Sequence, residues 1–166
     1  MIKFAFMGAL IVLCGFLGTS FSKVYDQKEL FFEEFVEFLS NIKSEVSFFK
    51  TDIVSILKKY TFKSKLQKIN QDITKLLENN ENLTNEKIEE ILNNYIIFEQ
   101  QDNLLICQMY CELGNLGYVE QIEKLEYYIN QFKISKEKNQ NRALKMKPFC
   151  KKISILIGLL VCIVLL

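Results

Sequence analysis

The 166-residue chain contains no histidine and no tryptophan, one proline and six glycines. Histidine is the side chain that most often serves as a general base near neutral pH and as a metal ligand. Its absence argues against Ser-His-Asp triads, zinc hydrolases and proton shuttles. The glycines lie near the two ends or in one turn, whereas a β-rich fold needs many glycine and proline turns and a phosphate-binding loop needs clustered glycines. The composition therefore predicts a helical protein that is not an enzyme.

The formal net charge of +1 conceals two regions of opposite sign. Residues 23–132 carry 12 basic and 19 acidic side chains, whereas residues 133–152 carry eight basic side chains and a single acidic one, Glu137. A basic stretch beside an apolar segment is attracted to anionic lipid head groups, by about 1 kcal/mol for each Lys or Arg near the surface. The alternative is a solvated helix face, the usual setting of a charge run. Because membrane adjacency accounts for this charge, we expect no nucleic-acid partner.

Two apolar segments bracket the chain. Residues 4–21 form an uncharged run of 18 residues. A helix of that length covers about 27 Å, close to the hydrocarbon thickness of a bilayer. Residues 153–166 are fewer, but a helix with Pro148 in its first turn and two lysines reaching the interface also spans the required length. We predict transmembrane helices at residues 1–22 and 149–166.

Charge near these segments predicts the side of the membrane on which the middle of the chain lies. Among the lysines close to the two apolar segments, only Lys3 lies on the outer side. Six lie on the inner side: Lys23, Lys28, Lys145, Lys147, Lys151 and Lys152. The positive-inside rule then places a helical-bundle domain, residues 23–148, in the cytoplasm. Residues 1–22 also have the positive start and the small residues of a cleaved signal peptide. In that alternative the product is exported and anchored by its C-terminal segment.

Apolar residues in the middle of the chain recur at helical spacing. Phe31, Phe35, Phe38, Ile42 and Val46 follow one another at intervals of three or four and form one stripe on a helix that continues from the first apolar segment. Further helices are expected at residues 53–60, 64–77, 88–98 and 102–113, and a long one from about residue 122. These give about six helices in all.

Loops and caps are expected between these helices. Thr51 and Asp52 are cap-forming residues before the second helix. The Asn-rich segment 78–85 is the clearest loop, with Thr84 or Asn85 capping the helix that follows. Gly114 is a natural residue to end the fifth helix.

Neither the cysteines nor the acidic clusters form a convincing chemical site. Cys107 and Cys111 lie four residues apart and would present two thiolates from adjacent helical turns. A closed metal site needs two more ligands, and the other cysteines lie in or beside the apolar segments, so we expect reduced, buried thiols and neither metal nor cofactor. Glutamates such as Glu33, Glu34 and Glu37 lie opposite the apolar stripe, where solvated charge belongs.

The second half of the chain carries a family resemblance. The run Glu112-Leu113-Gly114 is followed by Gln121 and, one helical turn later, by Leu125. A basic helix through Lys145 then leads into the apolar carboxyl end. This order and spacing resembles the stage III sporulation protein AB family.

The first half agrees with that family as well. An apolar amino-terminal segment runs into a helix that ends in Ser44-Glu45-Val46-Ser47-Phe48, and Thr51-Asp52-Ile53 stands at the start of the next helix. The acidic, aliphatic and aromatic order of the first of these runs is similar to the family pattern. The resemblance covers nearly the whole chain.

The resemblance implies a helical bundle similar to the cytoplasmic domain of type II secretion F proteins, flanked by transmembrane helices. It implies a non-enzymatic platform in the channel that joins mother cell and forespore during engulfment, in the mother-cell membrane facing the forespore. The implied partners are membrane lipid and other channel proteins, including a cytoplasmic secretion-type ATPase, and a homo-oligomer is left open.

Two surfaces are candidates for contact with these partners. One is the acidic face of the first helix, with Glu33, Glu37 and Glu45, and the other is the turn from Gly114 to Gln121. A general helical membrane adaptor unrelated to sporulation remains the alternative function.

Overall fold

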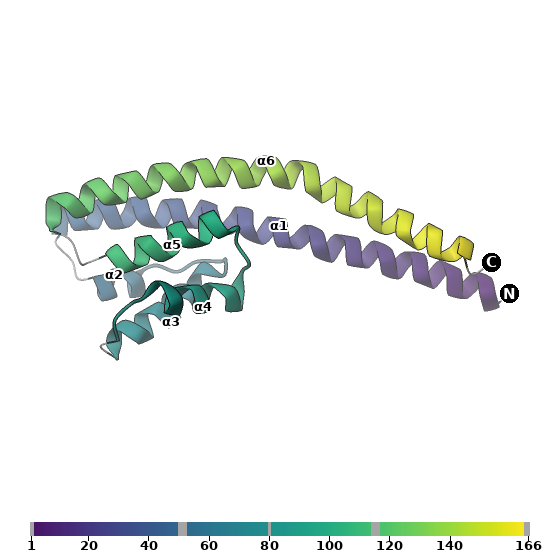
Figure 1. Ribbon diagram of the computed structural model, residues 1–166, viewed down its shortest axis with the longest axis horizontal. Helices are drawn as coiled ribbons and strands as arrows, with labels where there is room; N and C mark the ends of the chain where they lie inside the picture. The colour runs from purple at the N-terminus through teal and green to yellow at the C-terminus, as the bar shows by residue number, and fades with distance from the viewer. Residues whose placement is uncertain (1, 50–52, 80, 114–116, 165–166) are drawn as a thin grey trace. The chain divides into compact units, whose positions relative to one another are not determined.

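The computed structural model describes residues 2–49, 53–79, 81–113 and 117–164 (Figure 1). These residues form six helices and no strand. The helices are α1 (Ile2–Phe49), α2 (Ile53–Lys59), α3 (Leu66–Glu78), α4 (Asn85–Tyr95), α5 (Gln100–Glu112) and α6 (Tyr118–Val164). The prediction of an all-α fold with about six helices is confirmed, as is the continuation of the first apolar segment into the first helix.

The chain divides into two compact units. Unit 1 contains residues 1–29 and 138–166, which are the first part of α1 and the last part of α6. Unit 2 contains residues 30–137, which are the remainder of these two helices together with α2, α3, α4 and α5.

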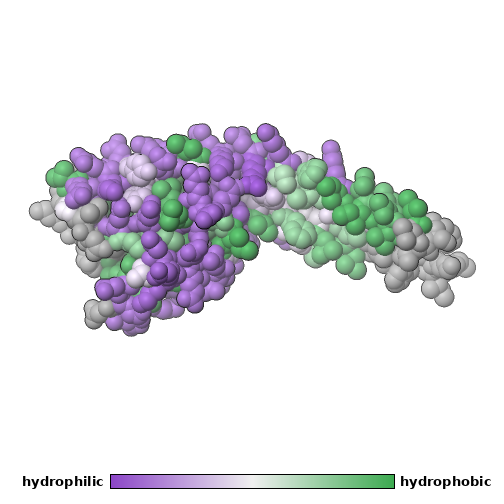
Figure 2. All heavy atoms as spheres, viewed as in Figure 1, coloured by the Kyte–Doolittle hydropathy of each residue, from purple (hydrophilic) through white to green (hydrophobic). Residues whose placement is uncertain are grey.

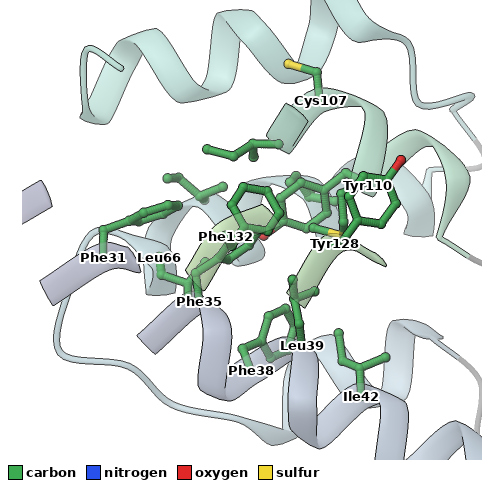
Figure 3. Close-up of a cluster of buried hydrophobic side chains, with 14 of the residues drawn as sticks. Phe31, Phe35, Phe38, Leu39, Ile42, Leu66, Cys107, Tyr110, Tyr128 and Phe132 are labelled. Carbon is green, nitrogen blue, oxygen red and sulfur yellow. The ribbon is translucent and has the colours of Figure 1, made fainter. Parts of the chain in front are cut away.

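The apolar stripe of α1 forms the centre of unit 2. Phe31, Phe35 and Phe38 are fully buried, and side chains from α1, α5 and α6 converge around them (Figure 3). The ring of Phe35 meets that of Phe132 edge to face, with centroids 4.7 Å apart, and the ring of Phe31 lies 4.8 Å from that of Phe98. Such aromatic pairs contribute about 0.5–1.5 kcal/mol each beyond the area that they bury. The stripe is therefore core, as its spacing predicts.

A buried polar pair links α5 to α3 inside this core. The hydroxyl of Tyr110 donates to Asn70 Oδ1 at 2.5 Å, and Thr74 Oγ1 donates to the Asn70 carbonyl at 2.6 Å. Burial raises the pKa of Tyr110, so its hydroxyl stays a donor at all ordinary pH values. Because a buried hydroxyl without a partner is costly, this bond favours one register of α5 against α3.

The fourth helix ends earlier than its apolar spacing predicts. We expected it to include Ile96 and Phe98, but α4 ends at Tyr95 and the backbone of Ile96 is extended, with φ −144° and ψ 131°. Side chains alternate along an extended segment, so Ile96 and Phe98 are buried while Ile97 is 77% exposed. Two asparagines at the end of α4 have weak helix propensity, and the β-branched pair after them favours the extended form.

The expected loop between the third and fourth helices is confirmed. Helix α3 ends at Glu78 and α4 begins at Asn85, with Thr84 Oγ1 accepting from the Lys87 N–H at 3.4 Å. The expected caps Thr51 and Asp52 and the helix end at Gly114 lie outside the described residues.

The expectation of a separate C-terminal helix with Pro148 in its first turn is wrong. Helix α6 is continuous from Tyr118 to Val164 and contains Pro148 in its interior. Proline has no N–H, so the carbonyl of Leu144 loses its usual helical donor. Both residues are exposed, so this loss falls on the outer side of the helix.

Among the residues that the structure describes, no helix combines the length and the hydropathy needed to cross a membrane. The two flanking transmembrane helices predicted from the sequence are therefore not supported by the structure.

Replacing Phe35 by alanine tests the core. Phe35 is fully buried against Phe132 and Tyr110, so Phe35→Ala should lower the free energy of unfolding by about 3–5 kcal/mol. The control is Ile97→Ala, because Ile97 is exposed and its truncation should cost little. Urea unfolding of the full-length protein in detergent, followed by circular dichroism, measures both. Equal losses in the two variants would contradict the assigned core.

Candidate membrane-facing and partner-facing surfaces

In unit 1, α1 and α6 run antiparallel and meet through small residues. A Cβ atom added to Gly18 would lie 2.7 Å from Ser154 Oγ and 3.3 Å from the Cys150 carbonyl oxygen. Ser22, one turn after Gly18, and Gly158, one turn after Ser154, are also buried. Small residues four apart on each helix let the two backbones approach closely, an arrangement common between helices in lipid.

The outer sides of these two helix ends are apolar. Figure 2 shows hydrophobic side chains gathered over the described residues of unit 1. Exposed large apolar residues of unit 1 include Val12, Leu13, Phe16, Leu17, Phe21, Ile155, Leu156, Ile157, Leu160 and Ile163. An apolar surface of this kind marks a contact with another protein or with a membrane. We call these residues the apolar surface of unit 1.

A cluster of charged residues follows the apolar residues of α1 in the sequence and precedes those of α6. Lys147 Nζ lies 2.5 Å from Asp26 Oδ1 and 2.9 Å from Glu29 Oε2, and hydrogen bonds to the two carboxylates raise the pKa of Lys147. These bonds join α6 to α1. The exposed side chains of Lys151 and Lys152 precede the apolar end of α6.

Two of the three candidate contact residues on α1 are exposed. The Glu33 side chain is 58% exposed, and its carboxylate lies 3.5 Å from Lys136 Nζ. Glu37 is exposed one turn further along. Both therefore remain available on the surface of unit 2.

Glu45 does not lie on that exposed face. Its residue is only 8% exposed, and its Oε1 accepts hydrogen bonds at 2.5 Å from both Lys59 Nζ and the Tyr60 hydroxyl. Hydrogen bonds from Lys59 and Tyr60 hold the pKa of Glu45 below its usual value, while burial raises the pKa of Tyr60 to about 12. Glu45 thus connects α1 to Lys59 in α2 and to Tyr60, the residue directly after α2. These internal partners account for a carboxylate at this position without a partner protein.

The second candidate surface was the turn from Gly114 to Gln121, and the structure has a groove between α5 and α6 that Gln121 does not line. The groove has a volume of about 570 Å³ and is lined by Gln108, Glu112, Glu120, Glu123, Lys124, Tyr127 and Tyr128. Gln121, predicted as a contact, is only 8% exposed and lines a small hollow of about 10 Å³ that shares three of these residues. Gly114, the other predicted residue of this turn, lies outside the described residues.

The groove residues Glu120, Glu123 and Tyr127 were not predicted from the sequence. Their spacing of three and four places them on one face of α6, so the helical period was a usable signal. The residues across the groove come from α5, and no spacing rule pairs them with α6.

Cys107 and Cys111 pack in the core of unit 2. Cys107 is buried, and burial raises the pKa of its thiol to about 11. The Cys111 thiol lies 3.6 Å from the Leu83 carbonyl oxygen and 3.4 Å from Asn85 Oδ1, and burial raises its pKa too. Raised thiol pKa values disfavour the thiolate that metal binding and redox chemistry require. In the described part of the chain, no cluster of three His, Cys, Asp or Glu residues is arranged to hold a metal.

Comparison with protein families finds one match that spans the chain. The profile of stage III sporulation protein AB matches residues 3–166. The chain belongs to the stage III sporulation protein AB family. It is therefore a sporulation-related protein, and the family is not a known family of enzymes. No curated protein and no solved structure matches the chain.

Gly18 and Gly15 allow a matched test of the helix pair in this family member. Gly18→Ala should separate α1 from α6 in unit 1, because the new Cβ would overlap Ser154. Gly15→Ala meets nothing within 4 Å and should leave the pair intact or strengthen it slightly, since alanine favours a helix. Hydrogen exchange of full-length protein in bilayers, read over residues 10–29 and 140–160, should rise only for Gly18→Ala. Equal exchange in the two variants would show that the close contact at Gly18 is absent.

Glu45 should contribute to the pH dependence of stability. Because its pKa is lower in the folded protein than in the unfolded chain, its contribution is complete above about pH 5 and is lost as pH falls through the folded pKa. Glu45→Gln should lower stability at pH 7 and flatten the decline below pH 5. Urea midpoints between pH 7 and pH 3 test this, with the exposed Glu90→Gln as control. An unchanged acid decline in Glu45→Gln would refute the role of this carboxylate.

Proposed function

We propose that this protein is a non-enzymatic membrane platform of the channel that joins mother cell and forespore during engulfment and spore formation. The family match supports the link to sporulation. The observation that carries the platform role is the apolar surface of unit 1, carried on two paired helices that continue into unit 2.

The two helix ends of unit 1 would form an antiparallel pair of helices in the mother-cell membrane. Side chains such as Phe16 and Leu156 are 69% and 63% exposed and would meet lipid. Gly18 and Ser154 supply the close packing on which helix pairs in lipid depend, because lipid provides no hydrophobic force between helices. Lys151 and Lys152 would reach the head groups of the cytoplasmic leaflet.

We also propose on which side of the membrane the chain ends and unit 2 lie. Both chain ends lie in unit 1. If the two antiparallel helices cross the membrane side by side, the two chain ends lie on the same face of it. The six lysines that flank the inner ends of the apolar segments favour the cytoplasm for the rest of the chain. Unit 2 would then face the mother-cell cytoplasm, where a secretion-type ATPase acts.

A platform works through contact and needs no active site. Glu33 and Glu37 present exposed carboxylates on α1, the helix whose other end lies in unit 1. Contact between an ATPase or another channel protein and this face would be transmitted along a continuous helix toward the membrane. Helix α6 offers the same continuity from the groove side.

A fluorescent fusion tests the proposal in cells. The fluorescent protein is inserted in the exposed loop at residues 81–82, between α3 and α4, and followed through growth and sporulation. Signal should be confined to the mother-cell membrane around the engulfing forespore, and deletion of the gene should arrest spores at engulfment. Signal in all vegetative membranes, with normal sporulation after deletion, would reject the channel role and favour a general membrane adaptor. Recovery of a processed protein beginning near residue 23 would instead favour the exported form.

A further inference from the structure

The groove between α5 and α6 has an acidic wall that the fold does not use. Glu112 is occupied, because its carboxylate lies 3.2 Å from Lys124 Nζ and accepts the Tyr128 hydroxyl at 2.9 Å. Glu120 and Glu123 are exposed, and neither carboxylate has a hydrogen bond or ion pair with another residue in the described part of the chain. The groove therefore carries two uncompensated negative charges.

An aromatic ring lies beside these charges. Tyr127 is 52% exposed, and its ring meets that of Tyr128 at a centroid distance of 5.4 Å. Glu120, Glu123 and Tyr127 line the same groove from one face of α6. Carboxylates beside an exposed aromatic face favour a cation, and the planar guanidinium of arginine suits both partners.

A buried amide next to the groove lacks a partner. Gln121 is more than nine-tenths buried, and its Nε2 has no hydrogen-bond acceptor among the described residues. It lines the small hollow that the groove residues Glu112, Lys124 and Tyr128 also line. Because an unpaired buried donor costs about 1–3 kcal/mol, an acceptor such as a peptide carbonyl, direct or through one water, would relieve this cost.

We propose that this groove binds a basic segment of a partner protein, with an arginine between Glu120, Glu123 and Tyr127 and a main-chain carbonyl near Gln121. The inference rests on the proposed platform function and specifies one of its contacts. A negatively charged ligand, such as a lipid head group, is disfavoured by the two uncompensated glutamates.

The partner is a different protein rather than a second copy. Half of the basic side chains in the basic segment of this chain, residues 133–152, already have partners within the molecule. Lys136 pairs with Glu33 and Lys147 with Asp26 and Glu29, while Lys138 and Arg142 also have partners. These cations are therefore less available to the groove of another copy.

Peptide binding to the full-length protein in detergent tests the inference. The probe is a fluorescein-labelled 12-residue peptide of alternating arginine and alanine, and the reference peptide has citrulline in place of each arginine. Anisotropy should show binding of the arginine peptide only. Glu120→Gln with Glu123→Gln should weaken binding about tenfold or more, and Tyr127→Ala about threefold to fivefold.

Control variants decide between a site and diffuse attraction. Glu86→Gln with Glu90→Gln removes the same charge from an exposed face of α4 and should leave the dissociation constant unchanged. Gln121→Leu should weaken binding without changing its dependence on salt. An equal effect of the α4 pair, or no binding of the arginine peptide, would overturn the groove site.

Two further measurements test the groove site, the identity of the partner and the platform function separately. If a peptide copying residues 133–147 binds as tightly, with the same dependence on Glu120 and Glu123, the occupant is a second copy and the partner assignment fails. The fluorescent fusion carrying the two α6 substitutions should still reach the mother-cell membrane. Loss of peptide specificity with correct localisation would overturn only the groove, whereas mislocalisation of the unsubstituted fusion would overturn the platform function.

Discussion

The antiparallel pairing of α1 with α6 is the interaction on which the rest of the structure depends. In unit 2 the pairing buries Phe35 against Phe132 and gives the short helices a surface to cover. In unit 1 it brings Gly18 against Ser154. The same two helices thus use aromatic packing in one unit and close backbone contact in the other. Aromatic burial removes apolar area from water, and small residues permit close van der Waals contact between two helices.

The distribution of charge fits a protein that works at a boundary. Unit 2 is rich in exposed glutamates, whereas residues 133–152, which lead into the apolar end of α6, have eight basic side chains and one acidic side chain. A net charge near zero therefore conceals a division that carries functional information. The proposed platform uses this division twice, with lysines toward anionic lipid and carboxylates toward protein partners. Neither use requires a catalytic group, which suits a chain without histidine.

The sequence predicted what depends on local periodicity. The aromatic stripe of α1, the Asn-rich loop and the Thr84 cap follow from spacing and capping preferences within a few residues. The prediction that the fourth helix includes Ile96 and Phe98 was wrong because a spacing of two residues fits an extended segment as well as the edge of a helical face. The prediction of Glu45 as an exposed residue was wrong because its partners, Lys59 and Tyr60, are 14 and 15 residues away and become neighbours only after folding.

Chemical cross-linking in sporulating cells tests the helix pairing most directly. With the native cysteines replaced by alanine, cysteines at Glu33 and Lys136, or at Lys43 and Glu126, should be joined by a short bismaleimide. In each pair the side chains reach each other from opposite helices, with Nζ and Oε atoms 3.5 Å and 3.1 Å apart. The crossed pair Glu33 with Glu126 should not react. Efficient cross-linking of the crossed pair, with none in the two matched pairs, would contradict the antiparallel register and the account built on it.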